Sequence, residues 1–242
     1  MTEIYQYIIE KILKSDIDRE VGIELLNKIK KEEKGYSDKI AIIGISAHYP
    51  NADGIHDFWE LLANSQDCMG VFPKNRQKDL NEYVKDKYGV FGDDIYAKGG
   101  YLSQIDLFDH AFFKIPYKEA ERMDPNQRLF LQTAYEALED AGYGVDKIKG
   151  TRTGVFLGYS NSLREDYSTY VKSSDQENNS ISVQANLESI IPSRLSYFLN
   201  LKGPSITFDT ACSSSLIAIQ AATDSLKKRE SNMAIAAGMK IN

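Results

Sequence analysis

The sequence predicts a layered α/β fold, because runs that fit buried strands alternate with segments whose apolar residues recur at helical spacing. Four short apolar runs fit strands, at 40–45, 153–158, 206–208 and 234–237. The segments between them carry helix patterns instead. Such alternation is typical of a sheet covered by helices. At 242 residues, the chain has room for one large domain or two small ones.

Residues 1–31 are predicted to form a helical hairpin outside this fold. Apolar residues recur every four positions from Ile4 in a first helix and from Val21 in a second. Asp18 fits the N-cap of the second helix. Neither helix can bury its own apolar stripe, so the pair must pack on itself, on the main domain or on another chain.

A charged run that ends in glycine follows the hairpin and is typical of a linker. We place the linker at 32–38 and the main domain at 39–242. The first strand of the main domain is expected at 40–45, where a continuous apolar run fits burial on both faces.

A short helix is expected from His56 to about Asn64. Its spacing places three apolar residues in a core: Phe58, Trp59 and Leu62. The segment 66–105 that follows is spotted with glycine and is expected to be irregular.

The clearest helix pattern begins at Asp124. That aspartate fits the N-cap, Pro125 fits the first turn, and Gly142 ends the pattern. Glu136 is assigned to the exposed face of this helix.

Two further helix patterns precede the third strand. The first, at 164–173, is weak. The second begins near Pro192 and runs to Leu199, because proline is tolerated only near the start of a helix.

Cys212 is the most informative residue, because it lies between the strand expected at 205–209 and a helix pattern that begins at Ser215. The free N–H groups and the dipole at a helix N-terminus stabilise a thiolate, which is the nucleophilic form of cysteine. The small neighbouring residues would let a thioester carbonyl approach. Position alone leaves a second interpretation open, in which Cys212 is a small buried core residue.

Composition excludes several classes of protein. A net charge of −6 without a long basic run argues against nucleic-acid binding. No apolar stretch is long enough to span a bilayer, and the first residues do not resemble a signal peptide. Two cysteines, Cys68 and Cys212, do not make a disulfide framework, so a cytoplasmic location is expected.

Other chemistry finds no support in the motifs. The three histidines, His48, His56 and His110, lack the spacing of metal ligands and are expected to be solvated or structural. Glycine-rich phosphate loops do not occur. The run from Gly158 to Ser162 begins like a hydrolase nucleophile elbow but lacks its second glycine.

The run from Asp209 to Leu216 resembles the active-site signature of β-ketoacyl synthases, the condensing domains of fatty acid and polyketide synthases. Further segments resemble the same family in the same order: 40–52, 58–62, 123–143 and 193–205. The resemblance covers about residues 39–242 and is strongest to modular polyketide synthases.

The resemblance implies the N-terminal half of a thiolase-like α/β/α/β/α fold. It implies that Cys212 accepts an acyl chain from a carrier-protein thioester, before decarboxylative condensation with a malonyl-type extender. It implies no directly bound cofactor, since substrates travel on the phosphopantetheine arm of acyl carrier proteins. It also implies a homodimer paired through 205–209, and the hairpin would contact an upstream synthase module.

In that family, two histidine motifs downstream of the cysteine promote decarboxylation and stabilise the enolate. Neither motif occurs in these 242 residues. We therefore expect a truncated sequence or one half of a split synthase, inactive in condensation by itself. An alternative is a non-catalytic half that only docks and positions partners. A complete small hydrolase using Cys212 is disfavoured, because no histidine lies in a recognisable partner motif.

Overall fold

The structure, a computed structural model, describes residues 2–34, 39–89, 96–160 and 186–241. The chain divides into two compact units, Met1–Ala41 and Ile42–Asn242. The weak helix pattern at 164–173 lies outside the described residues.

The first unit is a helical hairpin. It consists of α1 (Thr2–Leu13) and α2 (Arg19–Lys34). Asp18 caps α2, because its carboxylate accepts the Glu20 amide at 2.8 Å. The two helices meet at Gly22, where a Cβ atom would come within 2.4 Å of Ile12 Cδ1. Both helices and the cap agree with the prediction, although α2 continues to Lys34.

The second unit is built on a three-stranded parallel sheet in the order β2–β1–β3. The strands are β1 (Thr153–Tyr159), β2 (Ser205–Phe208) and β3 (Met233–Met239). All three lie where apolar runs predicted them. The central strand β1 is buried along its whole length and pairs with both neighbours.

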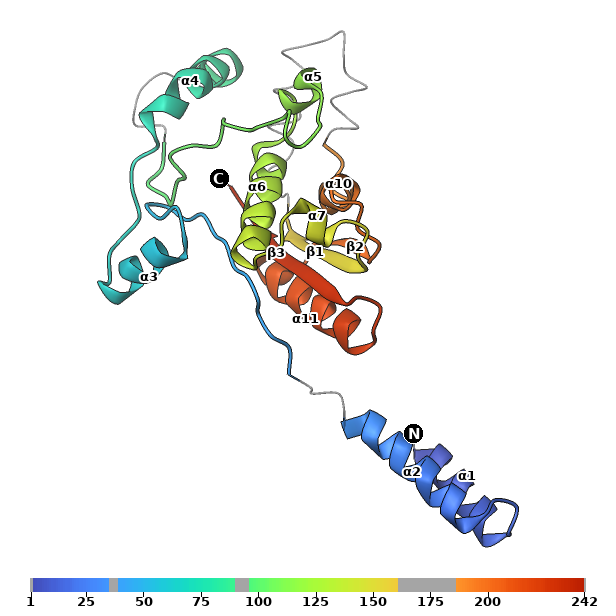
Figure 1. Ribbon diagram of the computed structural model, residues 1–242. Helices are drawn as coiled ribbons and strands as arrows, with labels where there is room; N and C mark the ends of the chain where they lie inside the picture. The colour runs from blue at the N-terminus through green and yellow to red at the C-terminus, as the bar shows by residue number, and fades with distance from the viewer. Residues whose placement is uncertain (1, 35–38, 90–95, 161–185, 242) are drawn as a thin grey trace. The chain divides into compact units, whose positions relative to one another are not determined.

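Helices cover both faces of this sheet (Figure 1). They are α6 (Pro125–Asp140), α7 (Val145–Ile148) and α10 (Ile190–Phe198) on one face, and α11 (Ser214–Lys227) on the other. Alternate residues of β1 supply the two cores, as the pleat requires. Val155 and Leu157 pack with α6 and α10, whereas Phe156 packs against Ala218 and Ala222 of α11. The predicted α/β layering is confirmed.

The start of α6 is held by a polar network. The Asp124 carboxylate accepts the Asn126 amide at 2.8 Å, so the predicted cap is confirmed. The Asn186 side chain accepts the Asp124 amide at 2.8 Å and donates to the Arg122 carbonyl at 2.9 Å. Nearby, Arg194 of α10 pairs at 2.7 Å with a glutamate of α5 (Tyr117–Ala120).

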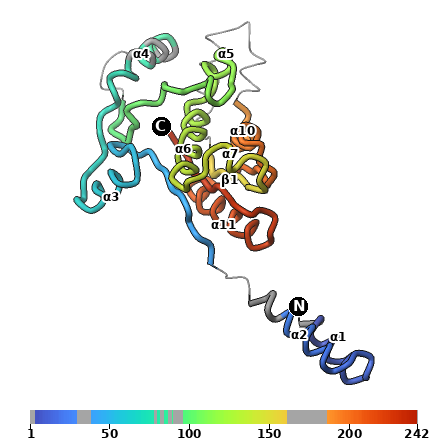
Figure 2. Tube along the Cα trace, viewed as in Figure 1, coloured from blue at the N-terminus to red at the C-terminus, as the bar shows by residue number. Residues whose placement is uncertain are grey.

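The strand predicted at 40–45 is wrong, because this segment has no regular structure. Ile42 is 85% exposed. Gly44 lies against α6, where a Cβ atom would come 2.3 Å from the Ala137 carbonyl oxygen. The Ile45 amide donates to an Asp140 carboxylate oxygen at 2.9 Å. At Gly44 and Ile45 the chain thus lies along α6 and not in the sheet (Figure 2).

Helix α3 (Ile55–Ala63) confirms the predicted helix, but the predicted core is wrong. Trp59 and Leu62 are 67% and 55% exposed, and α3 buries none of its residues. Phe58 stacks on Tyr49, with ring centroids 4.1 Å apart. Helical spacing identifies an apolar face, but it does not identify what covers that face.

The segment predicted to be irregular contains a helix, α4 (Lys74–Tyr88). It was missed because its residues are strongly polar and show no apolar period. Its ends carry the signals instead: Pro73 precedes it, and Gly89 ends it with φ of 66°. The Arg76 guanidinium lies 4.8 Å from the Phe72 ring centroid, and burial lowers the pKa of Arg76.

Candidate active site

Cys212 lies in a short turn between β2 and α11. The turn is a single 3₁₀ turn, Ala211–Ser213, and α11 begins at Ser214. Parallel strands direct their carboxyl ends to this edge of the sheet, which is where open α/β sheets present functional loops. The cysteine is exposed. The interpretation of Cys212 as a buried core residue is therefore wrong.

Hydroxyl groups hold the turn. The buried Ser214 hydroxyl accepts the Thr210 amide at 2.9 Å and donates to the Ala211 carbonyl at 2.7 Å. The exposed Ser213 hydroxyl donates to the Thr210 carbonyl at 2.8 Å. On the strand side, the Asp209 carboxylate accepts the Ala211 amide at 3.1 Å. The residues on both sides of Cys212 are thus fixed by hydrogen bonds.

Ala211 has a left-handed backbone conformation, with φ of 53°. This conformation costs an L-residue about 1 kcal/mol or more and persists only where its surroundings impose it. Both peptide groups of Ala211 are engaged, its N–H by Asp209 and its carbonyl by Ser214. The backbone therefore reverses sharply just before the thiol.

Two glycines make room beneath the turn. A Cβ atom on Gly158 of β1 would come 2.4 Å from the Ser214 carbonyl carbon. A Cβ atom on Gly238 of β3 would come 2.5 Å from the Ser215 Cβ atom. The start of α11 therefore rests directly on the sheet. This packing explains Gly158, which the sequence alone presented only as the start of an incomplete hydrolase motif.

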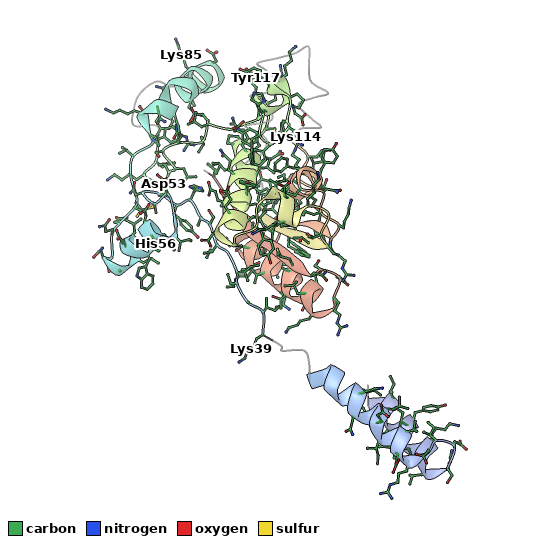
Figure 3. All side chains as sticks on the ribbon, in the orientation of Figure 1. Lys39, Asp53, His56, Lys85, Lys114 and Tyr117 are labelled. Atoms are coloured by element: carbon green, nitrogen blue, oxygen red, sulfur yellow. The ribbon has the colours of Figure 1, made fainter. Side chains whose placement is uncertain are left out.

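The histidines have other partners. His48 Nε2 lies 2.8 Å from a Glu136 carboxylate oxygen, and His110 Nδ1 lies 2.9 Å from the Ile115 carbonyl oxygen. His56 is exposed on α3 (Figure 3). Among the described residues, no hydrogen bond or ion pair joins a histidine to Cys212. The three are solvated or structural, as predicted.

The prediction for Glu136 is only partly right. The sequence assigned it to an exposed helix face, but its carboxylate accepts the Ser46 hydroxyl at 2.7 Å as well as contacting His48. The side chain is 42% exposed. It therefore helps to fasten the segment after Gly44 onto α6, a role that the sequence did not indicate.

The described part of the chain brings no three histidine, cysteine or carboxylate side chains together as a metal site. Over the same residues, the helices are too short or too polar to cross a membrane. Cys68 is half-buried in a loop, with Sγ 3.8 Å from the Gln66 carbonyl oxygen.

The chain is similar to polyketide synthases over most of its length. Polyketide synthase PksN of Bacillus subtilis (strain 168) is 41% identical over 202 residues, which cover 84% of this chain and 4% of the relative. Polyketide synthase GfsE of Streptomyces halstedii is 38% identical over 217 residues, 88% of this chain and 6% of the relative. The chain thus corresponds to a small part of these long relatives.

Solved structures extend the similarity to the fold. The ketosynthase from module 6 of the bacillaene synthase from Bacillus subtilis 168 has 35% identity and a TM-score of 0.64, covering 84% of this chain and 32% of that chain. The oxazolomycin ketosynthase domain OzmH KS7 of Streptomyces albus JA3453 has 32% identity and a TM-score of 0.68, covering 83% and 35%.

The architecture and these neighbours define a thiolase-like ketosynthase fold, and this chain covers about a third of the length of each of the two solved chains. Residues 37–242 match the family described as "Beta-ketoacyl synthase, N-terminal domain". The chain belongs to the β-ketoacyl synthase family and carries the N-terminal domain of a polyketide-type ketosynthase.

Proposed function

We propose that Cys212 is the acyl-accepting nucleophile of a polyketide-type ketosynthase. The observation that carries this proposal is an exposed thiol in a hydrogen-bonded turn at the start of a 14-residue helix. The positive end of the helix dipole favours negative charge there. Family membership supplies the reaction class that such a thiol would serve.

The proposed step is a thioester exchange. The Cys212 thiolate attacks the carbonyl carbon of an acyl thioester on the phosphopantetheine arm of an acyl carrier protein. A bond forms between that carbon and Sγ, and the bond to the pantetheine sulfur breaks. The released pantetheine thiolate takes up a proton from solvent, which replaces the one that the Cys212 thiol lost. The Cys212 amide would donate to the carbonyl oxygen as charge develops, and such a donor is worth about 3 kcal/mol.

We extend the proposal to condensation as a second stage. The acyl group on Cys212 would react with a malonyl-type extender that loses carbon dioxide. That stage needs groups that stabilise the enolate, and the described contacts of the histidines do not supply them. Acylation of Cys212 is therefore the reaction assigned to these 242 residues. The predicted cytoplasmic location stays a prediction.

Partner proposals follow from two surfaces. Strand β2 is an edge of the described sheet, so it is available to pair across a homodimer two-fold axis.

The hairpin exposes apolar side chains, with Ile4, Tyr7 and Leu13 at 54%, 60% and 79%. We assign it to docking of an upstream synthase module. The non-catalytic alternative keeps this docking role and removes the acyl chemistry.

The test compares the two cysteines. The chain is incubated with an acyl-carrier thioester and then measured by intact-protein and peptide mass spectrometry. One acyl group is expected on Cys212. The Cys212→Ala variant should lose the label, whereas Cys68→Ala should keep it. Equal labelling of the wild type and Cys212→Ala would reject the nucleophile assignment and leave the non-catalytic docking function.

A further inference from the structure

Ser214 differs from its neighbours in one respect that matters for Cys212. Its side chain is 5% exposed, whereas Ser213 is exposed. Water can replace the hydrogen bond of an exposed serine, but it cannot easily replace that of a buried one. Among the hydroxyls that hold the turn, the Ser214 hydroxyl is thus the one whose loss would not be compensated by solvent.

The Ser214 hydroxyl makes two bonds that enclose the turn. It accepts the Thr210 amide at 2.9 Å and donates to the Ala211 carbonyl at 2.7 Å. Thr210 and Ala211 are the two residues directly before Cys212. A single oxygen at the start of α11 therefore connects the helix to the exit of β2.

The same bonds oppose a backbone preference. Ala211 adopts φ of 53°, which an alanine does not favour. If the Ser214 hydroxyl is removed, the Thr210 amide loses its partner and the Ala211 carbonyl keeps only the Ser214 amide, so the turn can relax toward an ordinary conformation. The thiol would then move relative to the start of α11.

We propose that Ser214 is a positioning residue for Cys212, and that its hydroxyl holds Ala211 in the conformation that presents the thiol. This inference rests on the proposed acyl transfer to Cys212. Reaction rates depend steeply on placement, since a displacement of about 1 Å can cost about a hundredfold. Ser214 itself touches neither the substrate nor the reacting atoms.

Ser225 provides a matched control. It lies on the same helix, is 3% exposed, and exchanges a 2.9 Å hydrogen bond with Ser231. Ser225→Ala thus removes a buried hydroxyl of α11 outside the turn. We expect Ser214→Ala to lower the maximal acylation rate of Cys212 by about tenfold to a hundredfold. The maximal acylation rate of Ser225→Ala should equal that of the wild type. For both variants, the thioester concentration that gives the half-maximal rate should stay within about twofold of the wild-type value.

A rescue variant separates positioning from general stability. Glycine adopts a positive φ without strain, so Ala211→Gly combined with Ser214→Ala should recover most of the lost rate. A purely structural role for the hydroxyl predicts no such recovery. Equal rates for Ser214→Ala and Ser225→Ala, or a double variant as slow as Ser214→Ala, would overturn the proposal.

Two further measurements keep the test decisive. If Ser214→Ala does not fold, hydrogen exchange of the wild-type Thr210 amide decides, because a bonded amide is protected and exchange at the intrinsic rate contradicts the proposal. If wild-type Cys212 accepts no acyl group, the proposed function fails by itself. Alkylation of Cys212 by iodoacetamide then compares the same variants, and equal rates would overturn the positioning role.

Discussion

Gly158 of β1 and Gly238 of β3 lie opposite each other in the parallel sheet. The first turn of α11 packs against both glycines, in the space that a Cβ atom would otherwise fill. A side chain on either would strike Ser214 or Ser215. The cysteine turn is therefore built from three separated parts of the sequence, two strands that supply space and one helix start that fills it.

Gly158→Ala should lower the free energy of unfolding and slow the acylation of Cys212. The added methyl group meets backbone atoms at 2.4–2.6 Å, so the start of α11 must shift. Overpacking of this kind costs about 1–3 kcal/mol. Urea denaturation measures the stability change, and mass spectrometry measures the acylation rate.

Gly54→Ala is the control, because no atom lies within 4 Å of a Cβ built there. Its stability and acylation rate should match those of the wild type. If Gly158→Ala behaved like this control, the close packing of α11 on the sheet would not govern the turn.

The sequence predicted the elements that signal themselves locally. β1 is a continuous apolar run, and α6 carries an aspartate cap followed by proline. Residues 40–45 carry the same apolar signal, but a strand also needs a partner strand, which an apolar run does not specify. In the structure Gly44 and Ile45 contact α6 instead.

The candidate site was predictable only in part. The motif identified Cys212. The three serines that follow it have the same side chain, so the sequence does not show which of them holds the turn: Ser213, Ser214 or Ser215. Their separate roles depend on the phase of α11 and on Gly158, which lies more than fifty positions earlier in the chain. Such long-range contacts leave no local pattern.

Asn186→Ala should destabilise the chain, because its side chain ties together the residues around the start of α6. The substitution would remove its 2.8 Å bond to the Asp124 amide and its 2.9 Å bond to the Arg122 carbonyl. A fully buried group left unsatisfied costs about 1–3 kcal/mol, and these two groups are part-buried, so a loss near the lower end is expected. Chemical denaturation should show the loss, with Asp146→Ala, an exposed change on α7, as the neutral control. Identical midpoints for both variants would contradict this role.

Ile206→Lys should disrupt the proposed homodimer. Ile206 lies on the edge strand β2 and is 41% exposed. A lysine there would carry charge into the strand pair, and charged edge residues oppose pairing. Light scattering at micromolar concentration should show dimers for the wild type and monomers for the variant. Leu107→Lys, which changes a 60% exposed leucine outside the sheet, should stay dimeric. A monomeric wild type would count against the dimer.

Gly22→Val should disturb the docking hairpin and leave the second unit folded. A Cβ atom at this position already meets two side-chain carbons of Ile12 at 2.4–2.5 Å, and valine adds two methyl groups, so the packing of Ile12 against α2 must change. Acyl transfer from an upstream carrier protein should weaken, while transfer from a small soluble thioester should not change. Deletion of residues 1–34 should have the same effect. Unchanged transfer from the carrier protein in both variants would remove the docking role.

The chain of 242 residues should acylate Cys212 without forming carbon–carbon bonds. Condensation requires groups that stabilise the enolate, and His48 and His110 are already bonded to Glu136 and to the Ile115 carbonyl. When catalytic groups act as a unit, the absence of any one of them typically lowers the rate by several orders of magnitude. The chain is incubated with an acyl donor and a malonyl-type carrier thioester, and β-ketoacyl product is measured by mass spectrometry. Product above the background, lost in Cys212→Ala, would show that these residues suffice for condensation.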